Sequence, residues 1–189
     1  MLPFVPDTGW TRQTLRLAAG ESAELLFPGG PAEMVEAHSD LGDRMMEESG
    51  RSIADTRVSR RVRALILLRL EQAELDRDAV RRGLSLLSMP GNRGAAVRSL
   101  ARTVDTIWHA AGDQSADMSW YSKRLLLAGV YSSTLLYWLK RGSGEATEAF
   151  LDRQLAAVAR LGRMAGRGPK PSATVRPAAT TGERERPLI

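Results

Sequence analysis

The chain contains no cysteine and only two histidines, His38 and His109, among its 189 residues. Without cysteine there is no disulfide, zinc–thiolate site, iron–sulfur cluster or thiol nucleophile. Neither histidine follows a glutamate at the Glu-x-x-His spacing that carboxylate-bridged di-iron bundles use. We therefore expect no bound metal, no cofactor and no catalytic residue of these kinds.

Long hydrophobic runs and strand-like alternation are also missing. The longest uncharged run extends from Leu125 to Leu139 and is interrupted by Ser132, Ser133 and Thr134. A membrane-spanning helix needs about 20 apolar residues, so this run is more typical of a buried core helix. The N-terminal residues have neither the basic region nor the apolar region of a secretory signal. Because β-branched and aromatic residues do not alternate over any useful length, the sequence predicts an all-α fold.

The net charge of +5 does not belong to the body of the chain. Residues 160–189 alone carry +5, so residues 1–159 sum to zero, and residues 1–56 sum to −6. Binding to DNA phosphates requires cations, and an acidic face repels the duplex. We therefore expect no nucleic acid partner at the N-terminal part, and an anionic membrane surface is the better candidate partner for the basic tail.

Apolar spacing, caps and breakers predict a helical bundle that is followed by a disordered tail. The predicted helices are residues 11–19, 22–27, 31–46, 59–74, 78–87, 93–111, 118–139 and 145–165. Asp78 and Asp117 are the expected N-caps of the fifth and seventh of them. Gly, Pro, Ser, Thr and Arg dominate from Gly166 onward, which is typical of disorder. The expected parts are thus a helix-turn-helix-like N-terminal part at 1–56, a ligand-binding body at 57–165 and a tail at 166–189.

Four of the predicted helices have informative faces. The apolar stripe of the 59–74 helix consists of Val62, Leu65, Ile66, Leu70 and Ala73. The stripe expected for 93–111 consists of Val97, Leu100, Ala101, Val104, Trp108 and Ala111. The helix at 118–139 is apolar almost all round, so we expect it to be central. The last helix and the start of the tail gather Arg153, Arg160, Arg163 and Arg167 on one side, which fits either a solvated face or contact with anionic lipid.

An aromatic face stands out near the start of the 118–139 helix. Four residues, Asp117, Trp120, Tyr121 and Arg124, follow the spacing i, i+3, i+4 and i+7, which puts them on one side of a helix. A face of Trp, Tyr and Arg has the composition of a protein-binding hot spot. Alternatively, the two aromatic residues point inward and Arg124 pairs with Asp117 at the surface. The spacing does not distinguish these arrangements.

The pair Asp105 and His109 is the nearest approach to a catalytic constellation. The two residues are four apart and can meet on one helical face. A lone Asp–His pair of this kind usually serves only to orient the imidazole, although a lipid-modifying enzyme could use it. The sequence contains no Gly-x-Ser-x-Gly elbow and no phosphate-binding loop with a Walker lysine.

Several motifs together resemble a known family. They are Gly-Trp-Thr at 9–11, Leu-Phe-Pro-Gly-Gly-Pro at 26–31, Ala-Gly-Asp-Gln-Ser-x-Asp-x-x-Trp-Tyr-x-Lys-Arg at 111–124, and Thr-x-x-Phe-Leu-Asp-Arg at 147–153. With Tyr131 and Thr134, these motifs make residues 3–160 similar to a bacterial form of the coenzyme Q (ubiquinone) biosynthesis accessory family called Coq nine. The long motif at 111–124 is the specific one.

The resemblance implies a TetR-like all-helical fold with a vestigial helix-turn-helix, a homodimer and no enzymatic activity. It also implies a buried cavity for isoprenoid quinones or other lipids, which the protein presents to the di-iron demethoxyubiquinone hydroxylase. The residues that match the family's hydroxylase-binding patch are Asp117, Trp120, Tyr121 and Arg124, and this favours the exposed arrangement. The alternative function is a TetR-type ligand-responsive transcriptional regulator.

The tail departs from the family pattern. Mitochondrial members of the family have a further amphipathic helix near the C-terminus that binds membranes, whereas this chain has a segment rich in Pro and Arg. The expected location is the bacterial cytoplasm, and peripheral contact with the inner membrane stays open. The sequence does not identify the lipid, the residues that line the cavity or the dimer surface.

Overall fold

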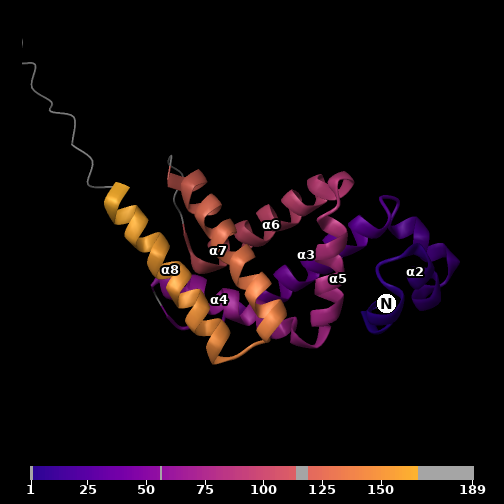
Figure 1. The fold of residues 1–189 in the computed structure, drawn as a ribbon, viewed down its shortest axis with the longest axis horizontal. Coiled ribbons are helices and arrows are strands. Elements are labelled where there is room, and N and C mark those ends of the chain that lie inside the picture. Colours follow the sequence, from indigo (N-terminus) through magenta and orange to yellow (C-terminus); the bar gives the residue numbers. More distant parts are fainter. Residues whose placement is uncertain (1, 56, 114–118, 166–189) are drawn as a thin grey trace, which may run out of the picture.

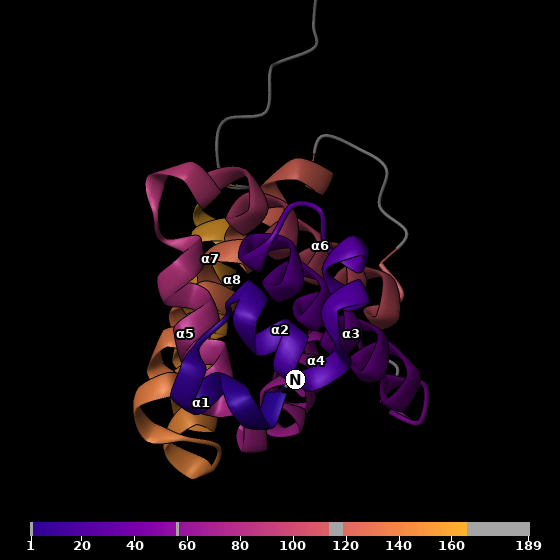
Figure 2. The same ribbon diagram turned by 90° about the vertical axis from the view of Figure 1, so that its right-hand side faces the viewer.

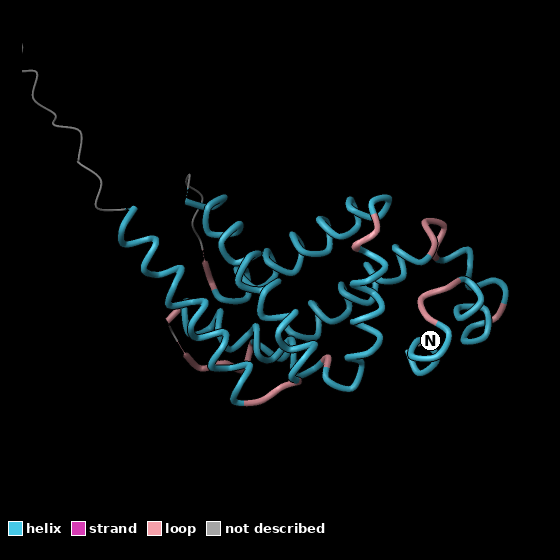
Figure 3. The backbone as a smooth tube through the Cα atoms, viewed as in Figure 1, coloured by secondary structure: helices cyan, strands magenta, loops and turns pink. Residues whose placement is uncertain are grey.

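The computed structural model describes residues 2–55, 57–113 and 119–165. Within these ranges every regular element is a helix and there is no strand (Figure 3). The predicted all-α fold is therefore confirmed. The TetR-like arrangement and the division into three parts stay predictions, and the tail at 166–189 lies outside the described residues.

The helices follow one another with short connections. The α-helices are α1 Val5–Thr8, α2 Arg12–Ala19, α3 Pro31–Gly50, α4 Val58–Gln72, α5 Arg77–Leu87, α6 Arg93–Ala111, α7 Ser119–Arg141 and α8 Glu145–Ala165. The 3-10 segments are η1 Leu2–Phe4, η2 Glu21–Leu26, η3 Glu74–Asp76 and η4 Pro90–Asn92. The predicted bounds of α6 and α8 are confirmed. The prediction that Asp78 caps α5 is wrong. Helix α5 begins at Arg77, so Asp78 lies inside it and Asp76 occupies the N-cap position.

The elongated molecule has the N-terminal helices at one end and α8 at the other (Figure 1). Seen from the N-terminal end, α1 and α2 lie in front of the longer helices (Figure 2). Two hydrophobic cores follow from this layout, and α3 contributes to both. Its Met34 and Val35 pack with Trp10 and Leu15 in the N-terminal core, whereas its Met46 belongs to the core of the body. The predicted apolar stripe of α4 is buried throughout.

The predicted stripe of α6 is partly wrong. Val97 is 67% exposed and Ala101 is also exposed, although Val104 and Ala111 are buried. The residues that α6 buries include the polar Ser99 and Thr103. The reason is that α6 packs along α3, where the buried Asp43 accepts a hydrogen bond from Thr103. The buried face of α6 therefore differs from the predicted one because of a polar partner on another helix.

Only one side of helix α7 is buried, although the sequence predicted a central helix. It buries Leu127, Val130, Tyr131 and Trp138, but Leu125 and Leu136 remain exposed. Among the described helices, none combines the length and the apolar character that are needed to cross a bilayer.

Candidate functional site

A cavity of about 370 Å³ lies among α3, α4, α5, α6 and α7. Its walls are mostly apolar and include Val35, Val80, Leu84, Leu87, Leu100 and Leu135. Leu136, which is 62% exposed, and the exposed Ser88 also line it, so the cavity reaches the surface beside these two residues. Pockets of a few hundred Å³ with apolar walls are typical sites for small organic ligands.

The N-terminal part contributes one wall of this cavity through Trp10. The indole Nε1 of Trp10 donates a hydrogen bond to the carbonyl oxygen of Ala79 on α5 at 2.8 Å. The Trp10 ring lies 5.4 Å, centroid to centroid, from the ring of His38 on α3. Gly83 permits this approach, because a Cβ there would lie 3.0 Å from Val35 Cγ1 and 3.4 Å from Trp10 Nε1. The hydrogen bond thereby holds Trp10 against α5 in the wall of the cavity.

A buried ion pair supports the inner end of the cavity. Arg69 Nε on α4 donates to Asp43 Oδ1 on α3 at 3.1 Å, and Arg69 Nη2 donates to the carbonyl oxygen of Ser39 at 3.3 Å. The hydroxyl of Thr103 donates to Asp43 at 2.8 Å from Oδ2. Gly42 makes room for this arrangement, because a Cβ at that position would overlap the guanidinium group of Arg69.

Polar groups gather where the cavity is most buried. We call His38, Arg69, Ser99, Thr103 and Tyr131 the inner polar residues, since all five line the cavity. Except for His38, which is half-buried, each is less than a tenth exposed. Ser99 and Thr103 lie on successive turns of α6, and Thr103 Oγ1 also lies 3.1 Å from the carbonyl oxygen of Ser99.

The titratable groups at this inner end carry almost no net charge together. Burial, and then the charge of Arg69, lower the pKa of His38, so its imidazole is uncharged at neutral pH. Burial raises the pKa of Tyr131, which keeps its phenol protonated. Burial also raises the pKa of Asp43, but Arg69 and Thr103 oppose that shift by favouring the carboxylate.

The sequence analysis missed the inner polar residues. The usable signal is that Ser99 and Thr103 interrupt the small and apolar series formed with Ala95 and Ile107 at four-residue spacing. No spacing rule could pair Asp43 with Arg69, because the two residues are 26 positions apart on different helices.

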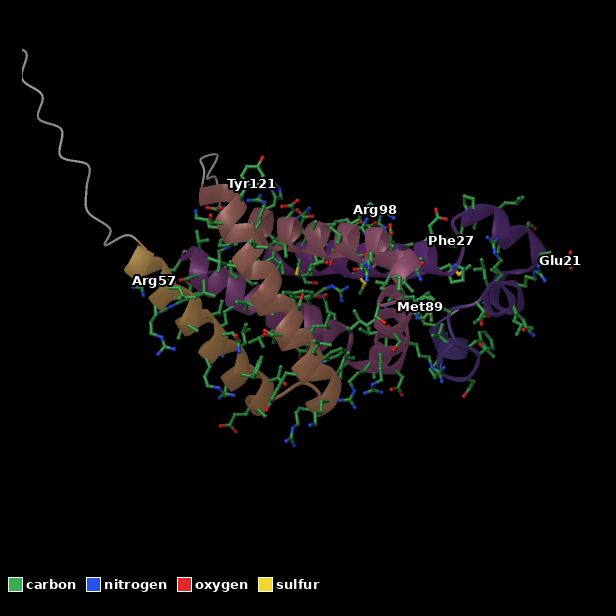
Figure 4. All side chains as sticks on the ribbon, turned by 45° about the horizontal axis from the view of Figure 1, so that its top comes forward. Glu21, Phe27, Arg57, Met89, Arg98 and Tyr121 are labelled. Carbon is green, nitrogen blue, oxygen red and sulfur yellow. The ribbon has the colours of Figure 1, made fainter. Side chains whose placement is uncertain are left out.

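The structure places the predicted partner-binding residues only in part. Asp117 and the side chain of Trp120 lie outside what the structure describes. Tyr121 on α7 is 72% exposed and lies at the end of the molecule opposite to Glu21 and Phe27 (Figure 4). Arg124 Nε donates a hydrogen bond to the Asp105 carboxylate of α6. Asp105 is therefore a residue of this region that the sequence analysis did not assign to it.

The contacts of Asp105 and His109 lead to two different helices. Asp105 bonds to Arg124 on α7, whereas His109 Nε2 lies 3.7 Å from Glu47 Oε1 on α3. The side chain of His109 is 82% exposed. Neither contact gives the orientation that a general base obtains from a buried carboxylate.

A second cavity of about 390 Å³ lies among α4, α6, α7 and α8. Its walls include Trp108, Leu126, Leu127, Val130, Leu155 and Val158. Lys123 also lines it, and its Nζ lies 5.9 Å from the centroid of the Trp108 ring and 3.2 Å from Asp113 Oδ1. Helices α4, α6 and α7 thus contribute residues to both apolar cavities.

Comparisons with known proteins show which family this chain resembles. The family model COQ9 matches residues 94–162, which include almost all of α6, α7 and α8. The chain is 29% identical over 181 residues to the ubiquinone biosynthesis protein COQ9, mitochondrial, of Rattus norvegicus, covering 87% of this chain and 58% of that protein. The corresponding Homo sapiens protein is 28% identical, with 87% and 57% covered.

A fungal relative is similar to the same degree. The ubiquinone biosynthesis protein coq9, mitochondrial, of Schizosaccharomyces pombe is 30% identical over 166 residues, which cover 82% of this chain and 65% of the relative. The chain therefore spans less than two thirds of the length of these relatives. The matched region contains Tyr121 and Arg124, two of the residues for which the sequence predicted partner binding. The family model over residues 94–162 and these relatives, which are 28–30% identical, support membership of the chain in the COQ9 family.

Proposed function

We propose that this chain is a non-enzymatic, lipid-binding accessory protein of ubiquinone biosynthesis. It binds isoprenoid quinone intermediates and presents them to the demethoxyubiquinone hydroxylase. Its relatives are ubiquinone biosynthesis proteins by name, which supports the pathway. The observation that carries the lipid-binding role is the apolar cavity among α3–α7.

The walls of this cavity supply the free energy that such a ligand needs. Burial of a CH₂ group is worth about 0.8 kcal/mol, so even a short prenyl segment is stabilised in the cavity without specific polar contacts. A site of this kind lowers the free energy of holding a quinone outside the bilayer. The enzyme that modifies the quinone then receives it from a protein surface.

Filling the cavity tests this role. Leu84→Trp adds a ring to the α5 wall, and we expect the amount of co-purified or added prenyl quinone to fall about tenfold or more, because a packed volume has no room for both. The lipid content is measured by mass spectrometry of solvent extracts. Val97→Trp is the matched control, since residue 97 is exposed on α6. An unchanged lipid load in Leu84→Trp would contradict the cavity assignment.

The aromatic face at the start of α7 is the proposed site for the hydroxylase. Its support is the exposed Tyr121 and the contact that ties Arg124 to α6. Exposed Trp and Tyr residues beside Arg are frequent hot spots.

Trp120→Lys is expected to abolish co-purification with the hydroxylase, because a cation replaces the largest apolar side chain of the proposed interface. Circular dichroism and lipid content should stay unchanged. Leu25→Lys is the control, because Leu25 is 84% exposed in η2, at the other end of the molecule. Retained co-purification of the Trp120→Lys variant would remove the docking role.

Two features argue for this function over an enzyme or a DNA-binding regulator. Asp105 and His109 contact different helices, as described above, rather than forming an acid–base pair. In such a regulator, η2 would have to be the DNA-reading segment, but it has the sequence Glu-Ser-Ala-Glu-Leu-Leu and contains no cation. A DNA-reading segment relies on cations for the phosphates.

We further propose a homodimer and a peripheral membrane contact. Exposed Leu125 on α7, with exposed Leu161 on α8, gives a second copy an apolar surface to bury. Exposed Arg153 and Arg160 of α8 and the basic tail are the candidates for contact with anionic lipid. The proposed location is the bacterial cytoplasm at the inner membrane.

A further inference from the structure

The buried serine of α6 is the starting point for assigning an orientation to the ligand. Ser99 is 6% exposed, and its hydroxyl has no hydrogen-bond partner among the described residues. Ser99 also lines the cavity. A buried hydroxyl without a partner costs free energy, and the cost is removed when a ligand oxygen accepts its proton.

The neighbours of Ser99 select the charge of that ligand. Arg69 is already paired with Asp43, and Thr103 donates to the same carboxylate, so no net charge is left for an ionic head group. His38 and Tyr131, the other polar groups here, are uncharged at neutral pH for the reasons given above. An anionic head group would therefore lose its hydration without gaining a counter-ion. A neutral group with carbonyl or hydroxyl oxygens fits these partners.

The volume of the cavity limits how much of a ligand it holds. At about 30 Å³ for each water-sized group, 370 Å³ accommodates on the order of a dozen non-hydrogen atoms. A quinone ring with its oxygens and the first isoprene unit is of this size, whereas a long polyprenyl tail is several times larger. The remainder of the tail must leave the cavity, and exposed Leu136 provides an apolar exit.

From these observations we infer that the cavity takes the neutral, oxygen-bearing ring of a prenylated quinone or phenol inward, onto Ser99 and its polar neighbours, while the tail leaves past Leu136. This inference rests on the proposed lipid-binding function and adds the orientation of the ligand. One consequence is that the bound ring is sheltered from the hydroxylase, so release of the ring from the cavity must precede its modification.

Tryptophan fluorescence tests the orientation directly. A quinone in contact with an indole quenches its emission, and Trp10 lines the cavity. With a ubiquinone analogue that carries two isoprene units, we expect quenching in the unmodified protein that is markedly reduced in Trp10→Phe. A prenyl hydrocarbon of the same length, which has no quinone ring, should bind without quenching, and the corresponding prenyl diphosphate should fail to compete.

Ser99→Ala adds a second and independent readout. We expect the affinity for the quinone to fall about tenfold through loss of one hydrogen bond to the ring, and the affinity for the hydrocarbon to stay the same. The ligand-free variant should melt at a higher temperature, because an unpartnered buried hydroxyl is gone; a purely structural serine would give the opposite shift. Ser88→Ala is the matched control, since Ser88 is exposed at the rim and its hydroxyl already donates to the carbonyl oxygen of Ser85.

The outcomes separate the two levels of the proposal. Quinone binding that does not quench Trp10 and does not depend on Ser99 would overturn the inward orientation while leaving the lipid-binding function intact. If neither the quinone nor the hydrocarbon binds, the lipid-binding function itself fails, and the orientation fails with it.

Discussion

Replacing Arg69 with methionine is expected to lower the free energy of unfolding by about 3–5 kcal/mol, because it leaves the buried Asp43 carboxylate without its counter-charge. Arg69 Nε lies 3.1 Å from Asp43 Oδ1, and the two side chains are 10% and 2% exposed. The hydrogen bond from Thr103 and Arg102 Nε at 4.0 Å remain, but both are weaker substitutes for the charge at Arg69. Chemical denaturation at pH 7 measures the loss.

A second substitution distinguishes the pair from simple loss of packing. In the Arg69→Met background, Asp43→Asn removes the unpaired charge while keeping a group that can accept from Thr103, so most of the lost stability should return. Arg98→Met is the control, because Arg98 forms an exposed ion pair with Glu36, and such pairs are worth about 1 kcal/mol or less. Equal stability of the single and double variants would contradict the role of the charge.

The pH dependence of Arg69→Met should also change in a defined direction. Without Arg69, the pKa of Asp43 rises further above its ordinary value, so the folded state binds a proton more tightly than the unfolded state does. The variant therefore gains stability relative to the original protein as the pH falls through that raised pKa, and loses this gain above it.

Trp138→Ala is expected to cost about 3–5 kcal/mol, because it opens a large cavity in the core of the body. Trp138 is fully buried near the C-terminal end of α7. Its indole Nε1 donates to Glu74 Oε2 at 2.8 Å, and the same carboxylate oxygen accepts from the backbone nitrogen of Ser143 at 2.9 Å. Trp138 thereby joins α7 to η3 and to the turn before α8.

Trp138→Phe separates the two contributions. It keeps most of the apolar volume but removes the indole donor, so we expect a loss of about 1–2 kcal/mol. Glu74 retains its hydrogen bonds from Ser143, which limits the cost. Thermal unfolding of the two variants, compared with the original protein, provides the measurement. Equal losses in both would mean that the hydrogen bond, and not the packing, stabilises this end of α7.

Local sequence signals predicted the helices well where they act within one element. The bounds of α6 and α8 and the buried stripe of α4 depend on residues a few positions apart. The cap of α5 was misplaced by two residues, because Asp76 and Asp78 both suit an N-terminal position. Caps and periodicity are properties of neighbouring residues, so a single sequence contains them.

The candidate site likewise contains residues that local sequence signals predicted and residues that only tertiary packing brings together. The aromatic and charged residues near the start of α7 were visible as a spacing, and the family followed from the motif around them. The inner polar residues were not visible, because Ser99 looks like an interruption of an apolar stripe until α3 is packed against it. Val97 was expected inside and is exposed for the same reason.

By itself, the sequence determined that the protein is built from helices, that its body is neutral and its tail basic, and that residues 117–124 carry an unusual aromatic and charged pattern. Only the tertiary structure decided that Asp43 meets Arg69, that Trp10 reaches α5, and that five helices enclose a cavity with a polar inner end. The physical reason is that helix periodicity specifies which residues share a face. What that face meets depends on contacts between residues far apart in the chain, and those contacts determine whether a polar side chain is solvated, paired or available to a ligand.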